Sequence, residues 1–220
     1  MPVRRAFPIL ISAGTFTALL ILGWGFRDFP SFFASGPRAA FLPIMAVAVA
    51  CAAVSAQNPM KKGTRTPPGQ PLVLASVHIV TLPLLFVLPY ADKRAIFVMH
   101  SEWVRWLGLS GTLAGYAIGI VALRTLGQNY SAYVTILEPH RLVQTGIYRV
   151  VRNPIYLGNL LSWPGTCLVF RSWLVFPIFL YFLVFAVFRG AQEERLLREQ
   201  FNTEFEAYRQ RTWRLVPYVY

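Results

Sequence analysis

The segment RNPIYLGNLLSWPGTCLVFRSWLVFPIFLYFLVFAVFRG, residues 152–190, contains two apolar runs with one polar pair between them. The runs extend from Pro154 to Phe170 and from Trp173 to Phe188, and Arg171-Ser172 separates them. Each run is near the lower length limit for crossing a hydrocarbon core of about 30 Å. The pattern predicts a tight helical hairpin in a membrane, either fully spanning or re-entrant, whose two outer ends lie at the same level.

Four longer apolar runs precede this hairpin. They are Phe7 to Phe26, Ala39 to Ala56, Pro71 to Ala91 and Trp106 to Leu123. No small-residue cleavage site follows the first run, so we interpret it as a span and not as a signal peptide. In the fourth run, Gly111, Gly115 and Gly119 lie on one helix face, which favours close helix packing. We therefore predict an all-α protein: a polytopic integral membrane helical bundle of about five to six transmembrane helices, with the C-terminal helical hairpin and a cytosolic C-terminal helix.

The composition supports a membrane location. The chain is 55% hydrophobic and only 14% charged, whereas a soluble domain carries about 25% charged residues. Its net charge of +12 lies between apolar runs and not on a soluble face, so we expect no nucleic-acid partner. The two cysteines, Cys51 and Cys167, lie inside apolar runs, and the three scattered histidines form no metal-binding pattern. We therefore predict no metal site.

The basic residues also predict the orientation. If the N-terminus is cytoplasmic and all six runs cross, 15 of the 21 lysines and arginines lie on the cytoplasmic side. Positive residues concentrate on that side of membrane proteins. We therefore expect a multi-pass protein with both termini in the cytoplasm, in a bacterial inner membrane in preference to an organelle membrane.

The start of the hairpin carries polar groups that a simple span would not need. Asn153 is a favoured N-cap and Pro154 is favoured at the first helical position, so a helix should begin there. Free backbone N–H groups at a helix start attract anions, and Arg152 adds a full positive charge beside them. Tyr148 and Tyr156 flank this point. We interpret the region as an anion seat with aromatic walls.

An acidic pair follows the other end of the hairpin. Glu193 and Glu194 come one turn after Arg189, in a segment with helical periodicity, RGAQEERLLREQFNTEFEAYRQR. Because the hairpin returns the chain to the level of Asn153, these carboxylates should face the anion seat. Such a pocket suits a zwitterionic ligand with a flat ring, and it opens sideways to lipid. Gly158, in the first turn of the hairpin, indicates close approach of another helix or of a ligand.

The residues that define this pocket also carry a family resemblance. HRLVQTGIYRVVRNPIYLG, residues 140–158, followed by EERLLREQFNTEFEAYRQR, residues 193–211, resembles the isoprenylcysteine carboxyl methyltransferase family, which is itself similar to phospholipid methyltransferases. One departure is notable, because the family's Arg-His-Pro is Arg152-Asn153-Pro154 here. Asn can cap a helix and donate a hydrogen bond, but it cannot shuttle a proton near neutral pH as His can.

The resemblance implies an integral membrane methyltransferase that uses S-adenosyl-L-methionine and receives a lipophilic methyl acceptor from the bilayer. It divides the chain into residues 1–125, with four transmembrane helices, and residues 126–220, the catalytic region with a cytosolic loop, the hairpin 154–188 and a tail helix. Carried over by position, the implied cofactor contacts are His140, Leu142, Val143, Tyr148, Asn153, Pro154, Ile155, Tyr156 and Glu193. Arg189 would face the acceptor.

The residues themselves suggest further roles. Arg152 beside the helix start suits the cofactor carboxylate, and a glutamate suits its ammonium group. A carboxylate acceptor needs no general base, whereas a thiol or an amine would, and Glu194 is then the nearest candidate. Together with Arg189, these two residues are the predicted catalytic groups.

Two other classes of protein remain open. The pieces YLGNLL and RLVPYVY are similar to membrane reductases that act on sterols or other lipids with NADPH. A non-enzymatic transporter or assembly factor is the third reading, although His78 is almost the only ionisable residue within the spans, which favours a site over a pore. Neither the acceptor nor the oligomeric state can be read from the sequence.

Overall fold

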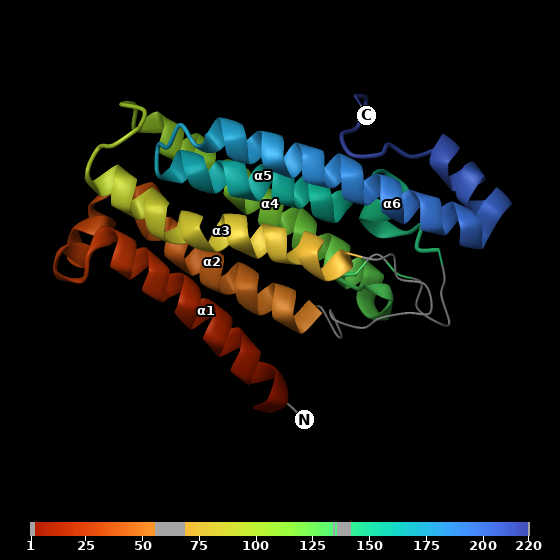
Figure 1. Ribbon diagram of the computed structural model, residues 1–220, viewed down its shortest axis with the longest axis horizontal. Helices are drawn as coiled ribbons and strands as arrows, with labels where there is room; N and C mark the ends of the chain where they lie inside the picture. The colour runs from red at the N-terminus through yellow and green to blue at the C-terminus, as the bar shows by residue number, and fades with distance from the viewer. Residues whose placement is uncertain (1–2, 56–68, 134, 136–141, 220) are drawn as a thin grey trace.

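The computed structural model describes residues 3–55, 69–133, 135 and 142–219, and the regular structure within them is almost wholly helical (Figure 1). The helices are α1 (Val3–Trp24), α2 (Gly36–Ser55), α3 (Gln70–Lys93), α4 (Trp103–Leu126), α5 (Pro154–Val169) and α6 (Val175–Gln210). Short 3-10 helices cover η1 (Phe26–Ala34), η2 (Gly127–Asn129) and η3 (Gly146–Arg149). The all-α prediction is confirmed, and each of the six predicted apolar runs falls mainly within one helix.

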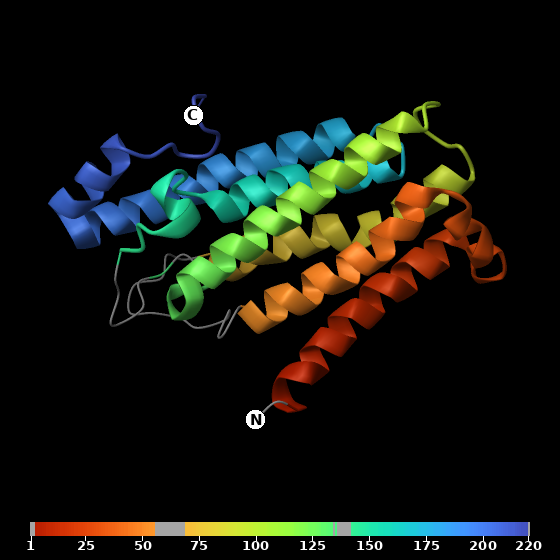
Figure 2. The ribbon, with the colours of Figure 1, turned by 180° about the vertical axis from the view of Figure 1, so that it is seen from behind.

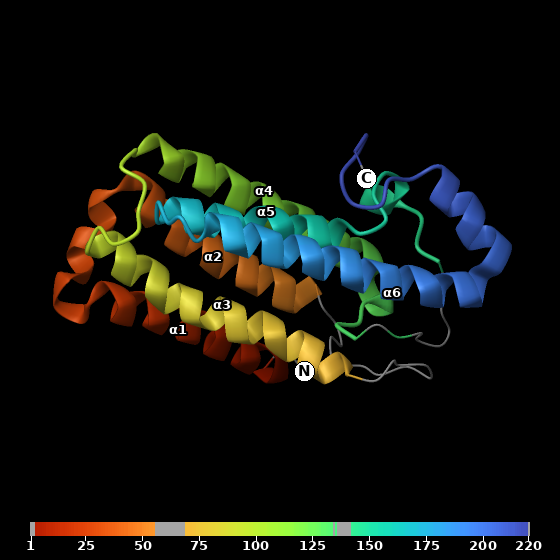
Figure 3. The ribbon, with the colours of Figure 1, turned by 45° about the horizontal axis from the view of Figure 1, so that its top comes forward.

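The helices differ in their ability to cross a membrane. α2, α3, α4 and α6 are long and apolar enough to do so. With 16 residues, α5 is only about 24 Å long, which is shorter than a typical hydrocarbon core. It lies between α4 and α6 (Figure 3), and Gly158, Gly165 and other residues along it are buried. The hairpin therefore consists of one short enclosed helix and one long helix.

Glycines bring α4 and α5 into close contact. A Cβ atom added at Gly115 would lie 2.5 Å from the backbone oxygen of Gly158, and one at Gly108 would lie 2.4 Å from the backbone nitrogen of Val169. The neighbour of Gly158 is thus another helix and not a ligand. The predicted close-packing face is confirmed: Gly111 lies in ordinary contact with α5, and a Cβ added at Gly158 would lie 3.1 Å from the backbone nitrogen of Gly119. Gly119 itself has open space where its own Cβ would be, and Gly108 extends the face toward the other end of α5.

α6 runs from the hairpin into the charged tail without a separate loop. Its 36 residues would extend about 54 Å as a straight helix, well beyond the width of a hydrocarbon core. The helix is broken at Asn202, whose φ of 38° and ψ of −107° are not helical. The residues beyond the break form the bent end that projects from the bundle (Figure 1). The predicted membrane return and the predicted tail helix are therefore one element with a kink.

The opposite end of the bundle is closed by buried charges that the sequence analysis did not identify. Asp92, near the end of α3, is only 3% exposed. Its carboxylate forms ion pairs of 3.0 Å with Arg38, 2.7 Å with Arg105 and 3.0 Å with Arg171. We call these four residues the far-end ion cluster. It joins α2, α3, α4 and the α5–α6 turn, whereas α1 leans away from the bundle toward its N-terminal end (Figure 2).

Candidate functional site

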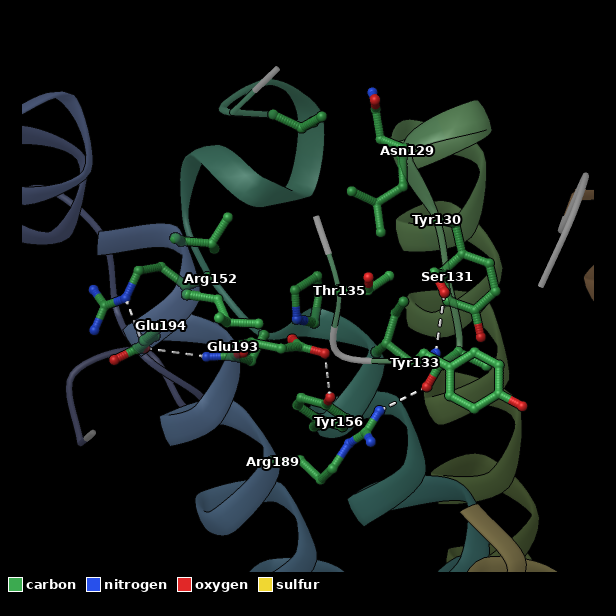
Figure 4. Close-up of a pocket in the computed structure, with 18 of the residues that line it drawn as sticks. Asn129, Tyr130, Ser131, Tyr133, Thr135, Arg152, Tyr156, Arg189, Glu193 and Glu194 are labelled. Atoms are coloured by element: carbon green, nitrogen blue, oxygen red, sulfur yellow. Dashed lines mark hydrogen bonds and ion pairs between the residues drawn. The ribbon is translucent and has the colours of Figure 1, made fainter. Parts of the chain in front are cut away.

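A cavity of about 350 Å³ lies where α4 ends, α5 begins and α6 becomes charged (Figure 4). The first turns of α3 form a further wall. This volume is in the range of small-molecule sites. The cavity is bounded by Leu74, Val77 and His78 on α3; Asn129, Tyr130, Ser131, Ala132 and Tyr133 after α4; Phe185 and Arg189 on α6; and Phe205 and Tyr208 beyond the kink.

Every predicted site residue that the structure describes lies on this cavity. They are Leu142, Val143, Tyr148, Arg152, Asn153, Pro154, Ile155, Tyr156, Arg189, Glu193 and Glu194. His140 lies outside the described residues. The hairpin thus brings the two parts of the sequence pattern together, although the individual roles of these residues stay predictions.

The start of α5 is where the sequence predicts it, but Asn153 does not cap it with its side chain. The helix begins at Pro154, and the Asn153 side chain makes no cap hydrogen bond. Its amide nitrogen instead donates to the backbone oxygen of Arg214 at 2.9 Å and to Glu194 at 3.4 Å. The predicted side-chain cap is therefore wrong. The hydrogen bonds of its amide nitrogen orient the side chain toward the C-terminal segment, so its oxygen does not accept from the first turn of the helix.

Glu194 is the centre of this arrangement. Its Oε1 atom lies 3.1 Å from Nε of Arg152 and 3.3 Å from Nε of Arg214. We call Arg152, Asn153, Glu194 and Arg214 the tail clasp. Arg152 also donates to the backbone oxygen of Arg209 at 3.0 Å. The anion beside Arg152 is thus a carboxylate of the protein itself, and the contacts favour a structural use of Arg152 and Glu194, two of the three predicted catalytic residues.

Backbone pairing reinforces the tail clasp. The amide of Arg152 donates to the oxygen of Trp213 at 2.9 Å, and the amide of Trp213 donates to the oxygen of Val150 at the same distance. The hydroxyl of Tyr208 donates to the backbone oxygen of Tyr148 at 2.7 Å. The C-terminal segment is therefore fixed to the residues that precede α5, directly beside the cavity.

Glu193 has different surroundings from its neighbour. Its carboxylate accepts a hydrogen bond of 2.6 Å from the hydroxyl of Tyr156, whose ring packs edge-on against Phe185 (Figure 4). Burial raises the pKa of the Tyr148 phenol well above its ordinary value, and Glu193 raises it further. Burial likewise raises the pKa of Tyr130. Neutral aromatic rings beside a carboxylate make a wall that suits a cationic ligand.

Arg189 has the reverse character, because it is a buried cation with neutral partners. The residue is 3% exposed. Its guanidinium donates to the backbone oxygen of Ala132 at 2.7 Å and to the side-chain oxygen of Gln70 (Figure 4 shows the first bond). Its Nε atom is buried without a hydrogen-bond partner. Among the described residues no carboxylate lies within ion-pair distance of the guanidinium, and the carboxylate whose charge interacts with it is that of Glu193, one turn further along α6.

Two parts of the site were not predicted from the sequence, the segment after α4 and the start of α3. Residues 128–133, just after α4, read QNYSAY, and those from Asn129 to Tyr133 line the cavity. This polar and aromatic run follows the fourth span on the side predicted to be cytoplasmic. That signal could have indicated a site wall. No local signal marks Gln70, whose importance depends on a partner 119 residues away.

Known proteins and a known family are similar in sequence to this chain. The phospholipid methyltransferase family matches residues 103–204. Protein-S-isoprenylcysteine O-methyltransferase B of Arabidopsis thaliana is 28% identical over 154 residues, which cover 67% of this chain and 77% of that protein. The Saccharomyces cerevisiae protein-S-isoprenylcysteine O-methyltransferase is 31% identical over 116 residues, covering 51% of this chain and 48% of that protein.

A solved structure resembles the fold as a whole. The eukaryotic intramembrane Ras methyltransferase ICMT aligns with a TM-score of 0.60 and 21% sequence identity, over 93% of this chain and 74% of that chain. Fold and relatives together define a multi-pass membrane methyltransferase. The chain is similar to the isoprenylcysteine O-methyltransferases over about two thirds of its length and to the phospholipid methyltransferases over residues 103–204. The predicted resemblance, fold class and enzyme class are thereby confirmed.

Proposed function

We propose that this enzyme transfers a methyl group from S-adenosyl-L-methionine to the carboxylate of an isoprenylated cysteine. The names of the relatives given above describe them as O-methyltransferases of protein S-isoprenylcysteine. The observation in this chain that carries the proposal is Arg189, a buried guanidinium on the cavity wall held only by neutral oxygens. A carboxylate acceptor would give this guanidinium the direct ion pair that no described residue makes with it.

The cofactor fits the chemistry of the opposite wall. S-adenosyl-L-methionine carries a cationic sulfur, an ammonium group and a flat ring. Glu193 and the rings of Tyr148 and Tyr156 would hold the positive groups, and Leu142 and Val143 would cover the ring. When bound, the cofactor supplies an electrophilic methyl group on a positively charged sulfur, which leaves as a neutral thioether.

The residues of the chain act mainly by positioning. Arg189 would orient the acceptor carboxylate so that one of its oxygens faces the methyl group of the bound cofactor. Holding two reactants in line can contribute roughly 7–11 kcal/mol to lowering a barrier. A carboxylate needs no general base, and Glu194 is engaged by Arg152 and Arg214. We therefore assign Glu194 and Arg152 to holding the C-terminal segment beside the site.

The acceptor would enter from the bilayer between α3 and α6. Leu74 and Val77 of α3 and Phe185 of α6 extend the cavity along membrane helices. The hydroxyls of Ser76 and Tyr181 connect the two helices by a hydrogen bond of 2.9 Å, one turn of α6 before Phe185. An apolar wall in this position suits an isoprenyl chain, and it leaves the charged end of the acceptor beside Arg189.

The distribution of basic residues supports an orientation with the cavity and both termini in the cytoplasm. The cofactor would then reach the cavity from the cytosol. Residues 126–220 supply most of the cavity wall, so we assign cofactor binding to that region, with residues 1–125 supplying the α3 wall.

The test is to incubate the purified enzyme with methyl-labelled S-adenosyl-L-methionine and either N-acetyl-S-farnesylcysteine or phosphatidylethanolamine vesicles. We expect label on the farnesylcysteine, released as methanol in alkali because it is held in an ester. Alkali-stable label in the lipid amine would instead support a phospholipid methyltransferase, the second candidate, which the family match to residues 103–204 favours. Label in neither acceptor would contradict both.

A further inference from the structure

Gln70, the first residue of α3, connects that helix to the candidate acceptor site. Its side chain is buried, with 1% of the residue exposed. The amide oxygen accepts a hydrogen bond from a terminal nitrogen of Arg189, and the amide nitrogen donates to Gln192 at 3.1 Å. Arg189 and Gln192 are three residues apart and lie on neighbouring positions of one helix face. Gln70 thus holds α6 at two points with its two polar atoms.

This connection matters because α3 packs mainly against α1, and α6 packs against α5. Among the described residues, side-chain hydrogen bonds from α3 to α6 are made by Gln70, and by Ser76 with Tyr181. The position of the Arg189 guanidinium relative to the α3 wall therefore depends on Gln70. Ala132, from the segment after α4, fixes the other terminal nitrogen.

The neutral character of Gln70 is as important as its position. An arginine has five N–H donors. Gln70 and Ala132 each accept one of them from Arg189, the Nε–H group is buried within the protein, and the bonds of the described residues leave two terminal N–H groups for a ligand. Neither acceptor carries a charge, so the guanidinium is fixed in place while its full positive charge stays available. A carboxylate at position 70 would fix the same group and neutralise it.

We propose that Gln70 is a positioning residue for methyl transfer, which holds Arg189 at the acceptor end of the cavity without cancelling its charge. The proposal rests on the proposed function, in which Arg189 binds the acceptor carboxylate. It assigns to the start of α3 a role in acceptor recognition that the sequence pattern in residues 140–211 does not include.

The test compares Gln70→Leu, Gln70→Glu and Gln192→Ala in the full-length enzyme with N-acetyl-S-farnesylcysteine as acceptor. Gln192→Ala is the matched control, since it removes the other bond of Gln70 and leaves Arg189 held. We expect Gln70→Leu to lower kcat/KM for the acceptor by about ten- to a hundredfold, the usual range for a lost buried hydrogen bond to a charged group. Gln70→Glu should chiefly raise the acceptor KM, because the new carboxylate competes for Arg189.

Three further measurements separate positioning from general damage. The affinity for S-adenosyl-L-methionine, measured by calorimetry, should change less than about twofold in both Gln70 variants, because the contacts of Glu193 are intact. In an Arg189→Met background, Gln70→Leu should have no further effect, because the two residues act through one group. Thermal unfolding of Gln70→Glu should match that of the unmodified enzyme.

Each outcome decides the matter. Equal kinetics for Gln70→Leu and Gln192→Ala would overturn the proposal, and so would a Gln70→Leu effect that persists without Arg189. A parallel loss of cofactor affinity and thermal stability in both Gln70 variants would show a purely structural residue. If the unmodified enzyme fails to methylate the farnesylcysteine, the proposed function fails and this inference fails with it, whereas normal transfer with unaffected Gln70 variants defeats the inference alone.

Discussion

Adjacent glutamates on α6 have opposite surroundings. Glu193 faces Tyr156 and the cavity, whereas Glu194 faces Arg152 and Arg214 (Figure 4). The difference follows from helix geometry, because consecutive residues point about 100° apart around the axis. One residue can therefore bind a ligand cation while the next holds the C-terminal segment.

The two glutamates should respond differently to the same substitution. Glu193→Gln removes the negative charge of the cavity wall, so we expect the Kd for S-adenosyl-L-methionine to rise about tenfold or more with little change in stability. Glu194→Gln leaves two guanidinium groups without their shared carboxylate, so we expect a loss of about 1–3 kcal/mol of stability. Calorimetric binding and thermal unfolding would measure both effects.

The Glu194→Gln variant also tests the hypothesis that Glu194 acts as a general base. If Glu194 only holds the tail, the pH dependence of kcat should be the same in Glu194→Gln as in the unmodified enzyme. Loss of one limb of the profile in that variant would restore Glu194 as a proton acceptor.

Tyr148 gives a prediction for alkaline pH. Burial raises the pKa of its phenol above the ordinary value, so the folded protein disfavours the phenolate. An unfolded tyrosine ionises near pH 10, so the stability contributed by this group is present below about pH 10 and declines above it. We expect the free energy of unfolding to decrease by up to about 1.4 kcal/mol per pH unit for this residue. Tyr148→Phe should show a shallower decline, and an identical slope would contradict the assignment.

At the scale of the elements, the contact between α4 and α5 is the most restrictive part of the fold. The first backbone turns of α5 lie directly on Gly115, so the helix that begins at the site can be placed only if that position has no side chain. α5 in turn carries Tyr156 to Glu193. The cavity wall therefore depends on a close helix contact in the membrane.

Two alanine substitutions on one helix should separate this effect from helix propensity. Gly115→Ala places a Cβ 2.5 Å from the Gly158 oxygen and the Ser162 nitrogen, which are backbone atoms that cannot rotate away. We expect a loss of about 1–3 kcal/mol and weaker cofactor binding. Gly119→Ala meets open space, so it should be neutral or slightly stabilising. Thermal unfolding in detergent would compare them, and equal effects of the two variants would contradict the packing argument.

At the scale of the whole molecule, the two ends of the bundle have different roles, because one end holds the cavity and the other holds a structural ion cluster. The cavity occupies the end where α5 begins, and the far-end ion cluster closes the end where α5 stops. Asp92 contacts arginines from α2, α4 and the α5–α6 turn. Because unpaired charges are costly in a membrane protein, this cluster should fix the relative positions of the helices.

Removing the central carboxylate tests that role. Asp92→Asn leaves two buried arginines, Arg38 and Arg105, and the partly buried Arg171 with one negative partner fewer, so we expect a loss of about 3–5 kcal/mol of stability. The enzyme that remains folded should still bind S-adenosyl-L-methionine, since the cavity lies at the other end. The control is Asp28→Asn, which removes an exposed pair with Lys93 and should cost less than about 1 kcal/mol. Unfolding temperatures in detergent, with cofactor affinity at low temperature, would check both expectations.

Much of the architecture could be predicted because it follows from the hydropathy and spacing of residues that are close together in the sequence. Hydropathy placed the six helices, and the short hairpin required Tyr156 and Glu193 to lie at one level. The partners of particular side chains could not be predicted in this way. Asn153 is a good cap by its local sequence, yet it bonds to Arg214, which lies 61 residues away in a segment without periodicity. Gln70 and Asp92 likewise acquire their roles only from distant partners.

The tail clasp bears on how the enzyme is made. Trp213 and Arg214 pair with residues just before α5, and both follow all six helices along the chain. A nascent chain emerges from its N-terminus onward, so the membrane helices can insert while this pairing is still impossible. The wall of the cavity beside the C-terminal segment is therefore completed only after the helices that carry the rest of the site have been made.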